Sequence, residues 1–176
     1  LQEVALSVDQ TDVTQPSEDH RRQFARPQSA QIVVVDANWG RAHSIKAGMA
    51  ALGDTATGVM ILPADMPDIT AADMAAVQAA ANLSSAPIVR ATTPQGTPGH
   101  PIYFAASQFS RFDDLHGDRG AYRLTIGLED QTLLVPLQGD RARLDLDTPQ
   151  DWDRPLYPSD ADADLLWVLL GCPRCN

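Results

Sequence analysis

The chain has 176 residues, 44% of them hydrophobic, and its 13 basic and 23 acidic residues give a formal net charge of -10 at pH 7. This length suffices for one domain with its own core. The acidic balance excludes an extended nucleic-acid surface, which needs a basic patch. It does not exclude a nucleotide, because a divalent cation held by carboxylates can supply the positive charge that phosphates need.

No stretch reaches the run of about eighteen apolar residues that a membrane helix requires. The opening LQEVALSVDQ has neither the basic start nor the cleavage site of a signal peptide. We therefore expect a cytoplasmic protein without a membrane partner. The cysteines Cys172 and Cys175 form a lone CxxC near the end of the chain. A lone CxxC is a weak metal signal, so a zinc or redox role and two reduced thiols both stay open.

The chain alternates between apolar runs and helical patterns. Runs typical of strands occupy residues 4–8, 31–36, 58–63, 86–92, 102–107, 132–137 and 141–147. Between the second and third strands, Ile45, Met49 and Leu52 fall at helical spacing. Thr70 followed by Asp73 is a capping-box pattern ahead of an alanine-rich helix. Two further helical segments are expected, over residues 107–115 and after the loop at 117–120.

Strands that alternate with helices predict a three-layer α/β/α, Rossmann-like fold, with a mostly parallel sheet covered on both faces. We assign residues 1–154 to this domain. Residues 155–176 are rich in proline and aspartate and predict a loosely attached C-terminal tail. The apolar stretch LLWVLL within this tail still has to be buried against something.

Acidic residues at two places suggest a metal site. Ligands of an open parallel sheet bind at the carboxyl ends of its strands, and Asp65 follows the strand over 58–63. Asp145 and Asp147 share one face of the strand expected over 141–147, just ahead of a helix start. Together they predict a magnesium site, completed by substrate phosphates and water. An alternative stays open, in which Asp65 caps a turn and Asp145 and Asp147 form a solvent-facing acidic edge.

A loop enters a helix at GRAHSIKAG, residues 40–48. Gly40, Ser44 and Gly48 at such a position suit the close approach of a flat base or a phosphate. A tight turn with a serine cap explains the same residues and stays open.

Two more stretches carry candidate side chains. His100 lies in PGHP, between constrained residues and just before a strand. A lone histidine is more often structural than functional. Asp118 and Arg119 lie on a glycine-flanked loop, where Arg119 can clamp a phosphate or form a surface ion pair of little energetic weight.

Five motifs in this order, SIKAG, VMILPADMPDIT, PGHPIYF, GDRGAYRL and LDLDTPQDW, resemble the nucleotidyltransferases of molybdenum-cofactor biosynthesis. The resemblance runs from about Val33 to Trp152, and the cytidylyltransferases that load CMP onto molybdopterin are the most similar. Related sequences act on sugar phosphates or on methylerythritol phosphate. The resemblance implies a fold of the nucleotide-diphospho-sugar-transferase type. It also implies transfer of CMP from CTP to a phosphorylated acceptor, with release of pyrophosphate and with Mg2+ as cofactor.

The resemblance also implies roles for single residues. Asp65 and Asp147 match the catalytic acids that bind magnesium, with Asp145 as a helper. His100 matches a catalytic residue in the turn that faces the acceptor.

For the substrates, the matching positions form two groups. Gly40, Ser44 and Gly48 fall in the segment that lines the nucleotide pocket. Asp118 and Arg119 fall in the loop beside His100, on the acceptor side.

One expected element is missing. The family begins with a strand and a glycine-rich loop of the type LAAGxSxRMGxxK that holds the triphosphate, and the chain contains neither. LQEVALSV reads as the family's second strand, so the sheet is expected to lack a core strand. An incomplete chain explains this, and so does a truncated, inactive relative that works as a binding module. The nucleobase and the acceptor stay open.

Overall fold

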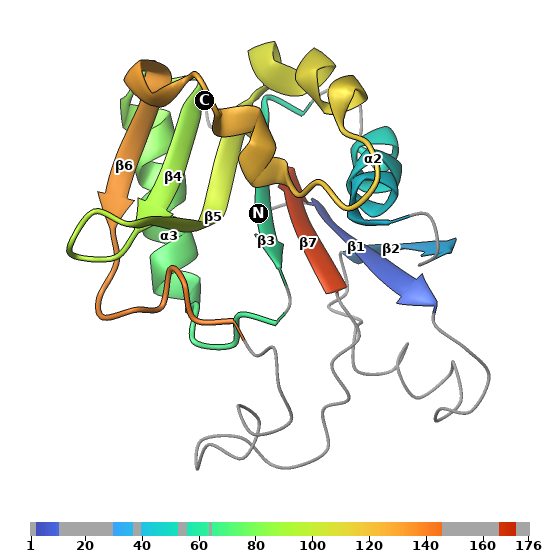
Figure 1. Ribbon diagram of the computed structural model, residues 1–176, viewed down its shortest axis with the longest axis horizontal. Helices are drawn as coiled ribbons and strands as arrows, with labels where there is room; N and C mark the ends of the chain where they lie inside the picture. The colour runs from blue at the N-terminus through green and yellow to red at the C-terminus, as the bar shows by residue number, and fades with distance from the viewer. Residues whose placement is uncertain are drawn as a thin grey trace.

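The computed structural model describes residues 40–52, 56–63 and 65–145 with side chains, and residues 3–10, 30–36 and 166–171 as backbone. The described strands form a seven-stranded sheet in the order β2-β1-β7-β3-β5-β4-β6 (Figure 1). The strands are β1 Glu3–Gln10, β2 Ala30–Asp36, β3 Gly58–Pro63, β4 Ile88–Thr92, β5 Pro98–Ala105, β6 Thr132–Pro136 and β7 Leu166–Gly171.

Five of the seven described strands run in the same direction, as the alternation of elements predicts, although the sheet is mixed because two antiparallel strands lie between them. β1 and β2 pair in parallel, and so do β4 and β6. β5 and β7 run antiparallel to the strands on both of their sides. The carboxyl ends of the other five strands therefore lie at one end of the sheet, toward which the arrows of β3, β4 and β6 point downward in Figure 1.

The strand β7 lies inside the sheet. Its residues pair with β1 on one side, where Leu166 lies opposite Val8, and with β3 on the other, where Trp167 lies opposite Pro63. The apolar LLWVLL stretch thus supplies a strand at the place between β1 and β3. Residues 166–171 are paired with the sheet and do not form a loosely attached segment.

Helices cover both faces of the sheet. The α-helices are α2 Arg41–Ala51 and α3 Ala71–Leu83, and the 3-10 helices are η2 Ala106–Asp114, η3 Ala121–Thr125 and η4 Glu129–Gln131. Ile61 of β3 belongs to a core cluster with Ile45 of α2 and Phe112 of η2. Its neighbour Met60 belongs to a second cluster, with Val77 of α3. Because adjacent residues of a strand face opposite ways, α2 and α3 lie on opposite faces, which confirms the three-layer prediction.

The start of α3 follows the capping-box prediction. The Asp73 backbone amide donates to Thr70 Oγ1 at 3.2 Å, and the Thr70 amide donates to Asp73 Oδ2 at 3.0 Å. Two amides that the first helical turn leaves without helical partners are satisfied in this way. This cap fixes where the loop that follows β3 ends.

Three expected boundaries differ from the structure. The strand predicted over 141–147 is wrong for the described residues 141–145, which form a turn. In this turn the amides of Arg143 and Leu144 donate to the Asp140 carbonyl at 2.8 and 3.0 Å, and these bonds replace a strand ladder. β5 begins at Pro98, so the PGHP segment lies within the strand. The helix expected over 107–115 is a 3-10 helix, η2.

Among the described residues, none of the helices has the length and apolar character needed to span a membrane.

Glycine is required at position 99, because β5 passes very close to the turn after β6. A Cβ built on Gly99 would lie 1.8 Å from the Ala142 carbonyl oxygen, so two backbone segments would have to separate. We expect Gly99→Ala to lower the free energy of unfolding by about 3 kcal/mol, the upper part of the usual overpacking range. Chemical denaturation monitored by circular dichroism measures this change.

Gly96→Ala is the matched control. Gly96 has a φ of +85° but open space around it, so we expect a loss of only about 1 kcal/mol from backbone strain. Equal losses for the two variants would contradict the close approach at Gly99.

Candidate active site

The candidate site lies at the carboxyl end of β3. Asp65 follows the last residue of that strand, Pro63, after one intervening residue. The Oδ1 atom of Asp65 is buried and accepts no hydrogen bond within the described part of the chain, while the residue makes another interaction. β5 runs antiparallel to β3 with Ile102 opposite Ile61, so His100, near the start of β5, lies beside the same end of β3. The sheet therefore brings Asp65 and His100 to one edge, the edge that the carboxyl ends of the parallel strands form.

His100 is partly buried and is held by the sheet. Its Nδ1 atom lies 3.5 Å from the Ile61 carbonyl oxygen, and its backbone amide donates to the Ala142 carbonyl at 2.8 Å. Burial lowers the pKa of His100 to about 4, and the Arg90 and Arg143 guanidiniums act in the same direction. The Ile61 carbonyl and the Asp145 carboxylate oppose this shift. The imidazole is thus neutral at pH 7.

Arg90 is a residue of the site region that motif spacing misses. It lies in β4, and its Nε donates to the Gly99 carbonyl at 3.0 Å while Nη1 donates to Thr125 Oγ1 at 3.0 Å. These bonds tie the segment before His100 to η3. The signal in the sequence is a charged residue within the apolar run PIVRAT, because a charge in a buried strand needs partners.

The turn after β6, residues 137–145, docks on the end of β4 and on the start of β5. The Leu137 amide donates to the Thr92 carbonyl at 2.8 Å, and Arg143 Nη1 donates to the Pro98 carbonyl at 3.3 Å. The turn ends at Asp145, whose carboxylate is near enough to act on the His100 pKa. Asp145 is exposed, and Asp147 lies outside the described residues. The structure thus brings Asp145 to the edge that carries His100, without the strand that the sequence predicts.

The start of α2 meets the loop at residues 117–120. The Ala42 amide donates to the Gly117 carbonyl at 2.9 Å. Gly40 has a φ of +78°, and a Cβ there would lie 2.9 Å from both Asp118 Oδ1 and the Gly117 carbonyl oxygen. Two glycine-containing motifs that are distant in the sequence are thus in contact.

The other expected residues of these two segments differ in exposure. Asp118 and Arg119 are exposed, so both side chains are accessible to a substrate. Ser44 is only 1% exposed and Gly48 is buried, so both lie inside the molecule in this structure. Their assignment to a nucleotide pocket stays a prediction.

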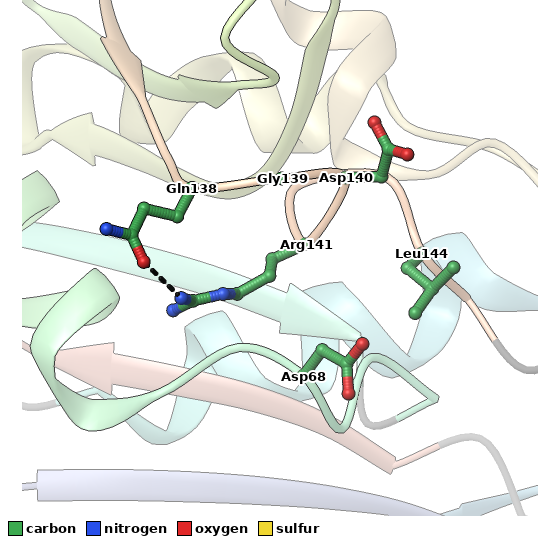
Figure 2. A pocket seen from close by; sticks show the side chains of 6 residues that line it. All are labelled: Asp68, Gln138, Gly139, Asp140, Arg141 and Leu144. Atoms are coloured by element: carbon green, nitrogen blue, oxygen red, sulfur yellow. Dashed lines mark hydrogen bonds between the residues drawn. The ribbon is translucent and has the colours of Figure 1, made fainter. Parts of the chain in front are cut away.

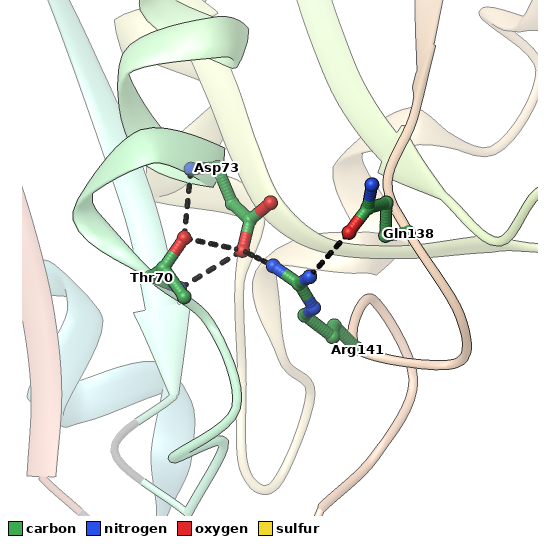
Figure 3. A network of polar contacts seen from close by, with 4 residues as sticks. All are labelled: Thr70, Asp73, Gln138 and Arg141. Atoms are coloured by element: carbon green, nitrogen blue, oxygen red, sulfur yellow. Dashed lines mark hydrogen bonds and ion pairs between the residues drawn. The ribbon is translucent and has the colours of Figure 1, made fainter.

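A cavity of about 450 Å³ lies beside the candidate site (Figure 2). Asp68 lines it from the loop after β3, and the turn after β6 supplies the other lining residues, Gln138, Gly139, Asp140, Arg141 and Leu144. Arg141 Nη1 donates to Asp73 Oδ2 at 2.8 Å, and Nη2 donates to Gln138 Oε1 at 2.9 Å (Figure 3). Arg141, which lines the cavity, therefore links the turn after β6 to the capping box of α3.

Within the described residues, no group of three or more histidine, cysteine or acidic side chains is arranged to hold a metal ion. The candidate donors in these ranges are the carboxylates of Asp65 and Asp145. Cys172 and Cys175 lie outside the described residues.

Five strands that run in one direction, with helices on both faces of the sheet, define an α/β protein, and ligands of such proteins bind at the carboxyl ends of the parallel strands. A family model described as a MobA-like NTP transferase domain matches residues 1–132. The chain belongs to this family, and nucleotidyl transfer is the class of reaction that the family defines. No curated protein matches the sequence.

Solved structures share the fold. Rv0371c from Mycobacterium tuberculosis H37Rv is 25% identical with a TM-score of 0.64, over 76% of this chain and 67% of that chain. Its homologue from Mycobacterium sp. strain JC1 is 28% identical with a TM-score of 0.64, over 77% of this chain and 67% of that chain. Rv0371c in complex with manganese is 22% identical with a TM-score of 0.63, over 77% of this chain and 70% of that chain.

A more distant neighbour is the 4-diphosphocytidyl-2C-methyl-D-erythritol synthase of Anaerococcus prevotii DSM 20548. It is 13% identical with a TM-score of 0.54, over 76% of this chain and 73% of that chain, a likeness that shows the fold alone. The fold is thus of the nucleotide-diphospho-sugar-transferase type. None of these neighbours is named as a molybdenum-cofactor cytidylyltransferase, so the narrower resemblance stays a prediction.

The low pKa of His100 predicts a pH dependence of stability. An unfolded histidine takes up a proton near pH 6.5, whereas folded His100 does so only near pH 4. Between these values the unfolded state binds more protons, so stability falls as the pH falls through this window and no further loss follows below it. We expect His100 to account for a loss of about 2–3 kcal/mol.

Denaturant unfolding of the wild type and of His100→Gln from pH 7.5 to pH 3.5 measures this contribution. The difference in free energy of unfolding between the two proteins should be constant above pH 7 and should shift in favour of His100→Gln toward pH 4. A difference that stays constant over the whole range would show that His100 titrates normally.

Proposed function

We propose that the protein is a Mg2+-dependent nucleotidyltransferase that transfers CMP from CTP to a phosphorylated acceptor such as molybdopterin. One observation carries the proposal. In a chain of the MobA-like NTP transferase family, Asp65 at the carboxyl end of β3 shares an edge with His100 and with the turn that ends at Asp145. Small-molecule ligands of parallel α/β sheets bind at that edge.

The proposed reaction is a single displacement at phosphorus. A phosphate oxygen of the acceptor attacks the α-phosphorus of CTP and forms a new P–O bond. The bond from the α-phosphorus to the oxygen that bridges to the β-phosphate breaks, and pyrophosphate leaves with that oxygen. Catalysis of such a step consists mainly of positioning and of stabilising negative charge.

The donor chemistry fits a hard divalent cation. Asp65 and Asp145 supply carboxylates from two different segments, and Asp147, outside the described residues, is the third candidate ligand. Magnesium accepts one or two carboxylates and fills its other positions with phosphate oxygens and water, so a cluster of three protein ligands is not required. When bound, Mg2+ would supply positive charge that offsets the negative charge developing on the phosphates.

In this proposal His100 binds the phosphorylated acceptor. Because burial keeps it neutral at pH 7, it can form a hydrogen bond to the acceptor without bringing a charge. Its backbone bond to Ala142 fixes the imidazole relative to the turn. Asp118 and the exposed Arg119 are the candidates for orienting the acceptor from the loop at 117–120.

The nucleotide side is proposed to involve Gly40, Ser44 and Gly48 of the α2 segment. Gly40 lies against Asp118, so the nucleotide and acceptor segments meet there. In the proposed roles, a base approaches the backbone near Gly40, while the buried Ser44 and Gly48 shape the helix behind it.

A sugar or polyol phosphate is the second candidate acceptor. The fold shared with the Anaerococcus synthase is compatible with it and does not discriminate between acceptors. Pyrophosphate release with CTP and either molybdopterin or methylerythritol phosphate distinguishes the two. Release with neither acceptor would favour a non-catalytic binding module.

The test of the metal role is the variant Asp65→Asn. It removes one negative charge and keeps the side-chain shape, so we expect CTP binding in the presence of Mg2+ to weaken by about 100-fold. Isothermal titration calorimetry with CTP at fixed Mg2+ measures this affinity. Asp114→Asn is the matched control, because Asp114 is exposed on η2, and it should bind as the wild type does.

Equal heats of CTP binding for the wild type and for Asp65→Asn would refute the metal role of Asp65. Titrations with ATP, GTP and UTP test the nucleobase separately. If CTP binds no more tightly than the other nucleotides, the proposed specificity for CTP is refuted. The assignment to the nucleotidyltransferases is not affected by that result.

A further inference from the structure

We propose that Arg141 is a positioning residue, which holds the segment carrying Asp65 and the segment carrying Asp145 at the separation that a divalent cation requires. This inference rests on the proposed function. Arg141 itself is not proposed to touch the cation or the substrates.

The first argument is the place of Arg141 between the two segments. Its Nη1 atom donates to Asp73 Oδ2 on α3 at 2.8 Å, and its Nη2 atom donates to Gln138 Oε1 within its own turn at 2.9 Å (Figure 3). One guanidinium therefore bonds at the same time to the cap of α3 and to the turn after β6. A planar guanidinium that donates in two directions fixes the relative position of its partners better than a single bond does.

The second argument is the rigidity of the Asp73 carboxylate, which accepts the hydrogen bond from Arg141. Asp73 Oδ2 also accepts hydrogen bonds from the Thr70 amide at 3.0 Å and from Thr70 Oγ1 at 2.7 Å. Burial alone would raise the pKa of Asp73, but hydrogen bonds from Thr70 and Arg141 hold that pKa below its usual value. The carboxylate is thus ionised, and its side chain is only 11% exposed. Arg141 is anchored to a fixed point.

The third argument is the short length of chain on each side. Asp65 precedes Thr70 by five residues, and Asp145 follows Arg141 by four. The turn after Arg141 is closed by the bonds from Arg143 and Leu144 to the Asp140 carbonyl. A displacement at the Arg141–Asp73 pair is therefore transmitted to both carboxylates and is not absorbed by a long flexible loop.

The fourth argument is the cavity between the segments. Asp68 from the loop after β3 and Leu144 from the turn both line a cavity of about 450 Å³ (Figure 2). Packed side chains do not fill this space, so the bond from Arg141, itself a lining residue, to Asp73 of α3 is a polar link beside the cavity that holds the turn to the segment after β3. Loss of the bridge lets the two segments separate.

The test measures binding of Mn2+ alone to the purified protein, by the electron paramagnetic resonance signal of unbound Mn2+. We expect Arg141→Gln to weaken Mn2+ binding about 10-fold, the lower limit for residues that orient metal ligands. The sign is diagnostic. Removal of the Arg141 positive charge would by itself reduce Coulomb repulsion of the cation and strengthen its binding, whereas loss of positioning weakens it.

Three further variants sharpen the test. Asp73→Asn should weaken Mn2+ binding to a similar extent, and the double variant with Arg141→Gln should be no worse than either single one, because both break the same bridge. Arg141→Lys should recover part of the affinity. Arg123→Gln is the matched control: Arg123 is exposed, lies over the Tyr122 ring on η3 and should bind Mn2+ as the wild type does.

Thermal unfolding without metal separates positioning from stability. If Arg141 were only structural, its variants would melt earlier but bind Mn2+ unchanged, and that result would overturn the inference. Additive effects of the two single variants would overturn it as well. If Arg141→Gln does not fold, Mn2+ binding by Arg141→Lys and by Asp73→Asn tests the inference instead. A wild type that binds no Mn2+ would refute the proposed metal role and this inference with it, whereas wild-type binding with unaffected variants refutes the inference alone.

Discussion

The backbone hydrogen bond from the His100 amide to the Ala142 carbonyl, 2.8 Å long, joins the two parts of the chain on which the candidate site depends. It is possible because residue 99 is glycine, since any Cβ there would collide with the same carbonyl. The bond seats the turn after β6 on the start of β5, next to the carboxyl end of β3. Without this contact the acid at the end of the turn would have no fixed relation to His100.

Around this contact, two arginines donate to backbone carbonyls at the start of β5. Arg90 bonds to Gly99 and Arg143 bonds to Pro98, so two successive carbonyls before His100 each accept from a guanidinium. Gly99 is buried, where a carbonyl without a partner costs stability, whereas Pro98 is exposed and its bond to Arg143 mainly positions the turn. The same guanidiniums help to keep the His100 imidazole neutral. The groups that stabilise the edge thus also set its electrostatics.

An acidic chain that handles a triphosphate has to manage repulsion between like charges. The site region does so locally, because Arg90, Arg141 and Arg143 lie within or beside it although acidic residues outnumber basic ones in the whole chain. A divalent cation between Asp65 and the turn would continue the same compensation. This arrangement explains how a net charge of -10 is compatible with nucleotide chemistry.

Local patterns in the sequence determined the strands β3, β4 and β6, the capping box at Thr70 and Asp73, and the three-layer class, because alternation, caps and helix propensity act over a few residues. Only the tertiary structure decided three other features. Residues 141–145 form a turn, because bonds to Asp140 and to β5 outweigh a strand pattern that has no ladder to join. Residues 166–171 enter the sheet between β1 and β3, a pairing between distant residues that no local pattern encodes. Arg141 meets Asp73, an ion pair between residues 68 positions apart that the folding of the sheet alone brings together.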